Sequence, residues 1–177
     1  MSPMRAQLKL RRRRGGEMTH QRYVEEGLHR YKQVLERQGP AGLDFLNARV
    51  EHRFTGVYQL VDGVMRNVYL HDKQGEIIPE FLKAVPLADS FCQFVLRDGF
   101  FCTANSALDP RLQGHKYQGV LGAYYGVPLL DNAGNLFGTL CHFENPNHDL
   151  PDEEFAFLQK AARLLPQYLF GRTQRTA

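Results

Sequence analysis

The sequence lacks any long hydrophobic run. No apolar stretch approaches the roughly 18 residues that a helix needs to cross a bilayer, and there is no tryptophan among the 177 residues. The mean hydropathy is −0.42, and 43% of the residues are hydrophobic. This composition excludes a collagen-like, a disordered or a transmembrane chain. At this length we expect one soluble globular domain with short appendages.

Cysteine is scarce and its spacing is uninformative. The three residues Cys92, Cys102 and Cys141 are an odd number, form no CxxC motif, and follow no apolar export signal. We therefore expect reduced thiols and a cytoplasmic protein. The seven histidines stand at no zinc-ligand spacing with these cysteines, so no metal site is predicted.

Acidic residues are absent from the first sixteen positions, which hold six of the 22 cations. The remainder carries 16 cations against 19 acids, so the basic character belongs to the tail. Without a basic face on the body, we expect no nucleic-acid partner. Residues 1–17 are predicted to be a disordered basic leader. Two alternatives are that this segment binds polyanions without specificity, or that translation starts at Met18. Residues 18–177 form the single domain.

Periodicity predicts the order of the elements. An amphipathic stripe of Val24, Leu28, Tyr31 and Leu35 indicates a helix over 18–38, and a short helix follows over 43–50. Strands are expected at 54–61 and 64–70, joined by the turn dipeptide at 62–63. A helix over 88–96, with Asp89 or Ser90 as its N-cap, precedes a strand at 100–103 and a long irregular connection over 105–122.

The C-terminal third predicts a second hairpin and a last helix. Strands over 123–130 and 136–143 flank a turn-rich loop, and a helix begins near Pro151 and ends before Pro166. Two tight hairpins and flanking helices indicate an α+β domain with a mainly antiparallel sheet of five or six strands and helices on both faces.

Four motifs in this order resemble the GAF domain family, a sensing module related in shape to PAS domains. They are Asp89-Ser90-Phe91-Cys92, Asp109-Pro110-Arg111-Leu112, the segment 123–129 (AYYGVPL) and the segment 134–141 (GNLFGTLC). The resemblance covers residues 53–165 and is closest to GAF domains of bacterial sensor and signalling proteins. It implies a ligand cavity on one sheet face and, on the other, terminal helices that form dimers.

Candidate ligand-binding residues follow from the resemblance and from the usual apolar lining of pockets. They are Tyr58, Phe91, Phe94, His115, Tyr125 and Cys141. Tyr124, Thr139, His142 and Phe143 are further candidates. Period two separates Thr139, Cys141 and Phe143 from Leu140 and His142, but it leaves open which face lines the cavity.

No enzymatic activity is expected from the motifs. Some GAF-fold proteins reduce free methionine sulfoxide through cysteines, and Cys92 matches one of them, but the segment 112–122 (LQGHKYQGVLG) lacks the catalytic cysteine. The same segment lacks a cysteine for bilin attachment. A haem would need His115 or His142 as its axial ligand, and the cofactor is left unknown.

The leading expectation is a non-enzymatic sensory or regulatory GAF domain. It would bind an unidentified small molecule and signal through its terminal helices, as a homodimer or to a signalling partner, because no output domain follows the last helix. The alternatives are a structural dimerisation module without a ligand and a thiol-based redox protein that uses Cys92.

Overall fold

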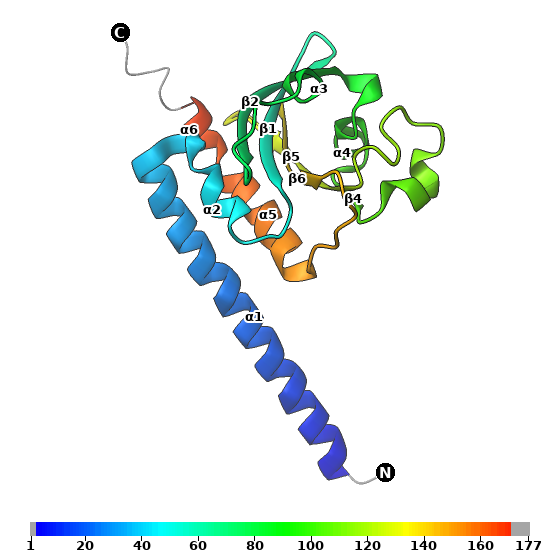
Figure 1. Cartoon of the computed structure of the whole chain (residues 1–177). Coiled ribbons are helices and arrows are strands. Elements are labelled where there is room, and N and C mark those ends of the chain that lie inside the picture. Colours follow the sequence, from blue (N-terminus) through cyan, green and yellow to red (C-terminus); the bar gives the residue numbers. More distant parts are fainter. Residues whose placement is uncertain (1–2, 171–177) are drawn as a thin grey trace.

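A six-stranded antiparallel sheet forms the centre of the fold (Figure 1). The structure is a computed structural model that describes residues 3–170, with side chains for residues 19–169. The strands lie in the order β3-β2-β1-β6-β5-β4. Their bounds are β1 (Phe54–Val61), β2 (Val64–Asp72), β3 (Ala84–Pro86), β4 (Phe101–Thr103), β5 (Ala123–Leu130) and β6 (Leu136–Glu144). The predicted α+β architecture is confirmed.

Both predicted hairpins are present. Asp62 and Gly63 adopt positive φ angles of 51° and 74° between the paired residues Val61 and Val64. Two left-handed residues produce a turn whose twist matches that of the flanking strands. In the second hairpin, the carboxylate of Asp131 accepts hydrogen bonds from the backbone N–H groups of Ala133 (2.9 Å) and Asn135 (2.8 Å). Local side-chain chemistry therefore closes both turns.

The N- and C-terminal helices cover one face of the sheet. They are α1 (Pro3–Gln38), α2 (Leu43–Asn47), α5 (Asp152–Leu164) and α6 (Pro166–Phe170). The predicted stripe of α1 is confirmed, because Val24, Tyr31 and Leu35 are buried and Leu28 packs beside them. They form one core with Leu158 of α5 and with strand residues. α5 ends before Pro166, as predicted, and Pro166 starts a new helix.

Helix α1 begins earlier than the sequence analysis expected. Its backbone is helical from Pro3, so it covers most of the segment predicted to be a disordered leader. Leucine, arginine, lysine and glutamine, which dominate this segment, all have favourable helix propensities. The first part of α1 extends away from the body of the domain, and its second part lies against α5 (Figure 1).

Short elements cover the other face of the sheet. They are α3 (Glu80–Lys83), α4 (Cys92–Asp98) and the irregular segment 105–122, which contains the 3₁₀ turns η3 (Ser106–Leu108) and η4 (Pro110–Leu112). Two further 3₁₀ turns are η1 (Gly39–Ala41) and η2 (Leu87–Asp89). Helices therefore lie on both faces, and the short ones form a roof over a second core built on Phe54, Met65 and Val95.

Gly138 allows β1 and β6 to approach closely. A Cβ atom at this position would overlap the backbone carbonyl of Tyr58. A glycine inside a strand is typical of such a close approach of two backbones. In the β1–β6 register, Gly138 is opposite Gln59, the residue that follows Tyr58.

A buried ion pair joins α5 to the segment after α2. The guanidinium of Arg49 donates two hydrogen bonds to the carboxylate of Glu154, at 2.9 and 3.0 Å, and stacks on the ring of Phe157 with its carbon 3.7 Å from the ring centre. The Tyr23 hydroxyl of α1 donates to the same carboxylate at 3.0 Å. Three elements are thereby held together at one buried charge.

Candidate functional site

An apolar pocket lies between the sheet and its roof. Its free volume is about 50 Å³. The floor is made of β1, β5 and β6, and the walls and roof come from α3, α4 and the irregular segment. The lining residues are Tyr58, Phe81, Leu82, Val85, Ser90, Phe91, Cys92, Tyr117, Leu121, Tyr124, Cys141 and Phe143. None of them carries a charge at neutral pH.

Aromatic side chains are half of the residues that line the pocket. Phe91 meets Tyr124 edge-on with ring centres 5.7 Å apart, and Phe143 stacks on Phe54 at 5.0 Å. Phe81 of α3 and Tyr117 of the irregular segment stack at 5.9 Å. Phe81 is 39% exposed, so this pair lies between the pocket and solvent. The deep rings are fixed by packing, whereas the outer pair rests on two short surface segments.

Two cysteines lie at the pocket floor and roof. The Cys92 sulfur is 3.3 Å from both the Tyr124 hydroxyl and the Thr139 hydroxyl, and the Cys141 thiol donates to the Gly56 carbonyl at 3.7 Å. Burial raises the pKa of Cys92, and the hydroxyls of Thr139 and Tyr124 offset part of this rise. Burial likewise raises the pKa of Cys141 well above its ordinary value. Both groups are neutral thiols at neutral pH.

The other polar groups of the lining differ in how they are satisfied. The Tyr58 hydroxyl donates to the Leu82 carbonyl at 2.9 Å. The Ser90 hydroxyl is buried and has no hydrogen-bond partner. The prediction that Asp89 or Ser90 caps the following helix is wrong, because α4 begins at Cys92 and no side chain caps its N-terminus. Ser90 is therefore left with an unused hydroxyl in an apolar wall.

Three of the six predicted ligand-binding residues line the pocket: Tyr58, Phe91 and Cys141. Phe94 lies behind the wall, where its ring centre is 4.9 Å from that of Phe101. Tyr125 is corrected to the opposite face, because consecutive residues of a strand point to opposite sides and its neighbour Tyr124 faces the pocket.

His115, the remaining predicted residue, belongs to the roof and does not line the cavity. Its Nδ1 accepts from the Tyr117 N–H at 3.2 Å, and its ring lies 4.9 Å from the ring of Phe91. Burial lowers its pKa. The ring connects the irregular segment to α4, so its role in this structure is to hold the roof.

Of the further candidates, Tyr124 and Phe143 line the pocket, and Thr139 contacts Cys92 from below. The lining residues that sequence reasoning missed come mainly from the roof. They are Phe81, Leu82, Val85, Ser90, Tyr117 and Leu121. These residues lie in or beside short irregular segments, where no periodicity marks the buried side. The period-two alternation of β6 could identify only residues of the pocket floor.

The Asp109-Pro110-Arg111 motif is architectural in this structure. The Asp109 carboxylate accepts from the Arg111 backbone N–H at 3.0 Å and from its guanidinium, which also donates to the Cys102 carbonyl at 2.7 Å. The same guanidinium lowers the pKa of Asp109. The motif thus fastens the irregular segment to β4 at the edge of the sheet.

A cluster of histidines is buried on the helix side of the sheet. The ring of His52 lies 6.3 Å from His142, 5.1 Å from His148 and 5.3 Å from Tyr125. Neither ring nitrogen of His52 has a hydrogen-bond partner, whereas Nδ1 of His142 is 2.7 Å from the Thr55 hydroxyl. Burial lowers the pKa of His52 to about 4 and that of His142 to about 3. Among the described residues, no group of three or more histidine, cysteine or carboxylate side chains is arranged to hold a metal.

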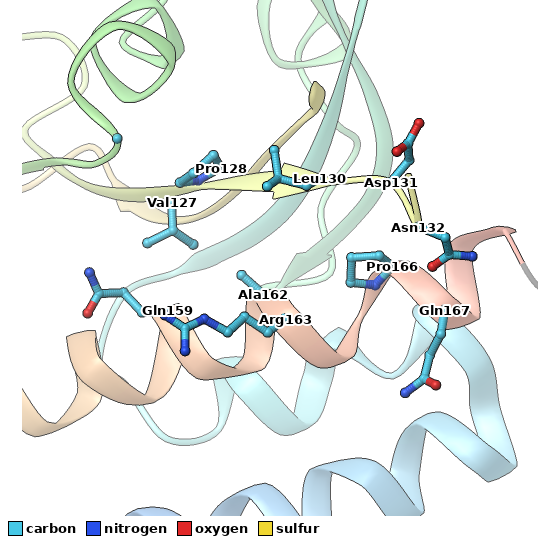
Figure 2. A pocket seen from close by; sticks show the side chains of 11 residues that line it. Val127, Pro128, Leu130, Asp131, Asn132, Gln159, Ala162, Arg163, Pro166 and Gln167 are labelled. Atoms are coloured by element: carbon cyan, nitrogen blue, oxygen red, sulfur yellow. The ribbon is translucent and has the colours of Figure 1, made fainter. Parts of the chain in front are cut away.

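A larger groove of about 600 Å³ lies on the helix side (Figure 2). One wall consists of Val127, Pro128 and Leu130 of β5, and the other of α5 and α6 (Figure 2). Its lining includes the charged side chains of Asp131 and Arg163 as well as uncharged amides, and it contains none of the predicted ligand-binding residues. The groove therefore lacks the mostly apolar wall that is typical of small-molecule sites.

These observations define a class of protein: an α+β fold of the GAF type with an apolar pocket on the sheet face away from the terminal helices. A scan against known protein families finds no match, and no curated protein is similar in sequence. Solved structures do match. The GAF domain of an Acinetobacter phosphoenolpyruvate-protein phosphotransferase has a TM-score of 0.66 at 13% identity, with 86% of this chain and 95% of that chain covered.

Structures of reductases match equally well. Free methionine-R-sulfoxide reductase from Neisseria meningitidis, solved with its substrate, has a TM-score of 0.66 at 16% identity, covering 85% of this chain and 90% of that chain. The fRMsr structure from Staphylococcus aureus has a TM-score of 0.63 at 14% identity, covering 82% and 94%. The chain therefore has the GAF fold, which confirms the resemblance seen in the motifs.

The same comparisons correct the expectation that the chain is not an enzyme. Methionine-R-sulfoxide reductases share this fold over most of its length, so the fold gives no ground for excluding catalysis. No enzymatic activity was expected because the segment 112–122 lacks a cysteine. The structure places two other thiols, those of Cys92 and Cys141, in the pocket wall. In the part of the chain that the structure describes, no helix is both long and apolar enough to cross a membrane.

Proposed function

We propose that the chain is a GAF-type sensory module that binds a small uncharged molecule in the pocket between sheet and roof. The observation that carries the proposal is the lining itself: aromatic rings, two neutral thiols and no charged side chain. Such a wall gains free energy by covering apolar surface, and it has no counter-charge for an ionic ligand.

Binding requires the outer aromatic pair to move. The free volume of about 50 Å³ is about a third of the roughly 150 Å³ of an engineered apolar cavity that binds benzene. Phe81 and Tyr117 contact each other from two separate short segments, so their separation enlarges the pocket without disturbing the sheet. We expect a ligand to enter between these two rings.

Signalling is proposed to pass through the floor of the pocket to the terminal helices. Cys141 and Phe143 of β6 line the pocket, and Leu140 of the same strand packs in the core that contains Leu158 of α5 and Tyr31 of α1. A ligand that displaces β6 therefore acts on the helix layer directly. We propose that these helices form the contact with a second copy or with a signalling partner.

A thermal-shift screen tests the binding proposal. A ligand that binds only the folded state stabilises it by RT ln(1 + [L]/Kd), so a metabolite panel is expected to yield compounds that raise the melting temperature. The variant Leu121→Trp, which fills the roof of the pocket, should lose this response. Leu130→Trp, at an exposed position outside the pocket, is the matched control and should keep it. A panel without any shift, or a shift that survives in Leu121→Trp, contradicts the proposal.

A second candidate function is thiol-dependent reduction of a sulfoxide, favoured by the presence of both Cys92 and Cys141 in the pocket wall. In such a reaction the sulfoxide sulfur accepts two electrons, its oxygen leaves as water, and the two thiols become a disulfide that an added dithiol reduces again. Two features oppose this chemistry: burial raises the pKa values of both thiols, and the lining has no charged side chain to pair with the ammonium and carboxylate of an amino-acid substrate.

An assay of free methionine-R-sulfoxide consumption with dithiothreitol tests the second candidate. Turnover that is lost in Cys92→Ser and in Cys141→Ser, but kept in Cys102→Ser, would establish it. Cys102 is the matched control because it is half-buried and does not line the pocket. Absence of turnover in the unmodified protein would refute it.

A further inference from the structure

Ser90 is the one lining residue whose hydroxyl is buried without a hydrogen-bond partner. It is 5% exposed. Its backbone is fully used, because its N–H donates to the Leu87 carbonyl at 3.1 Å and its carbonyl accepts from the Gln93 side chain at 3.0 Å. A hydroxyl removed from water without a replacement partner costs free energy, so a partner supplied by a ligand would recover it.

The other buried polar groups around the pocket are already engaged. Tyr58 donates to a backbone carbonyl, and the Tyr124 and Thr139 hydroxyls both contact the Cys92 sulfur. The Ser90 hydroxyl lies near the Cys92 sulfur and weakly lowers the pKa of that thiol, but no protein atom has hydrogen-bond geometry to the Ser90 oxygen. Ser90 is thus the available point of polar recognition in a wall of rings.

We propose that the pocket selects an uncharged planar molecule with a single hydrogen-bonding group, and that Ser90 is the residue that recognises this group. The inference rests on the proposed ligand-binding function and adds the chemical class of the ligand to it. The flat rings of Phe91, Tyr124 and Phe143 suit an aromatic or heteroaromatic body. The absence of charged side chains from the lining disfavours carboxylates, phosphates and ammonium groups.

Phenol and toluene are the probes that test this assignment. They have the same ring and nearly the same size, and only phenol offers a hydroxyl. Their dissociation constants are measured by ligand-observed NMR for the unmodified protein and for Ser90→Ala. The preference for phenol over toluene is expected to fall roughly threefold to tenfold in Ser90→Ala, which is the range of one neutral hydrogen bond.

Two further variants keep the test decisive. Ser90→Thr retains a hydroxyl and should retain the preference; the extended backbone at this position (φ −102°, ψ 153°) suits both alanine and threonine. Ser106→Ala removes a buried hydroxyl outside the pocket, which accepts from the Gly119 N–H, and should leave the preference unchanged. If Ser90→Ala does not fold, the comparison of Ser90→Thr with Ser90→Val replaces it. Ser90→Thr should keep the preference for phenol, and Ser90→Val should lose it.

The possible failures are distinguishable. If both probes bind and Ser90→Ala keeps the preference of the unmodified protein, the assignment of Ser90 is overturned while the binding proposal stands. If neither probe binds, and no compound of the panel shifts the melting temperature of the unmodified protein more than that of Leu121→Trp, the proposed function and the ligand class are both refuted.

Discussion

Replacing His52 by phenylalanine is expected to stabilise the protein, and more so in acid. The imidazole is fully buried, and neither ring nitrogen has a partner. Removing an unsatisfied buried polar group while keeping a flat ring of similar size should raise the free energy of unfolding at neutral pH by about 1 to 3 kcal/mol. The neighbouring rings of Tyr125 and His148 offer edge contacts that a phenyl ring can also make.

The acid part of the prediction follows from the pKa of His52. Burial is the main cause that lowers this pKa from 6.5 to about 4, with smaller contributions from the charges of His148 and Lys73, whereas the backbone of His148 and the carboxylate of Asp149 oppose the shift. The unfolded chain therefore binds the proton first as the pH falls. The stability contributed by the neutral ring is present above pH 6.5 and is lost as the pH falls toward about 4. At about pH 5 this loss amounts to roughly 2 kcal/mol in the unmodified protein.

Urea unfolding followed by circular dichroism at about pH 7 and about pH 5 measures both effects. The gain from His52→Phe should be larger at the lower pH by about 2 kcal/mol. His29→Phe, at an exposed position of α1, is the control and should give no such difference. If His52→Phe destabilises the protein and keeps the full acid sensitivity, the description of His52 as a buried, neutral and unpaired ring is refuted.

Three further predictions concern the helix layer and the entrance of the pocket. Arg49→Ala should lower the free energy of unfolding by about 3 to 5 kcal/mol, because it leaves the buried carboxylate of Glu154 without its cationic partner. Arg97→Ala, which removes an exposed ion pair, should leave the free energy of unfolding nearly unchanged, and urea titration measures both. Leu158→Ala should lower the free energy of unfolding by about 2 to 5 kcal/mol, because it leaves a cavity in the helix-side core. A change below about 1 kcal/mol would contradict the packing described. Phe81→Ala should raise the association rate of phenol in NMR line-shape measurements with little change in stability; an unchanged rate would show that ligands enter elsewhere.

The sheet could be predicted from the sequence because its signals are local. The turn dipeptide Asp62-Gly63 specifies a hairpin wherever it lies between two apolar runs, and Pro166 ends a helix in any context. The apolar stripe of α1 correctly predicted which side of the helix is buried. β3 was missed, since three residues at a sheet edge are too few to show an alternation.

The candidate site was less predictable because half of it lies on segments without periodicity. The alternation of β6 correctly grouped Cys141 with Phe143, but Tyr125 was taken together with Tyr124, although adjacent strand residues cannot share a face. On the roof, burial of Ser90 and Leu121 depends on which loop folds over which strand. That choice is made by tertiary contacts such as Phe81 with Tyr117, which no single segment encodes.

The pairing of β1 with β6 has a consequence for how the chain reaches this fold. Thr55 and His142 are opposite each other in the register although they are 87 positions apart in the sequence. During synthesis, the β1–β2 hairpin emerges with one edge open, and that edge has no partner until β6 has left the ribosome. The domain is thus expected to fold late and slowly relative to its length, and any truncation before residue 144 should expose an unpaired, apolar strand edge that is prone to aggregate.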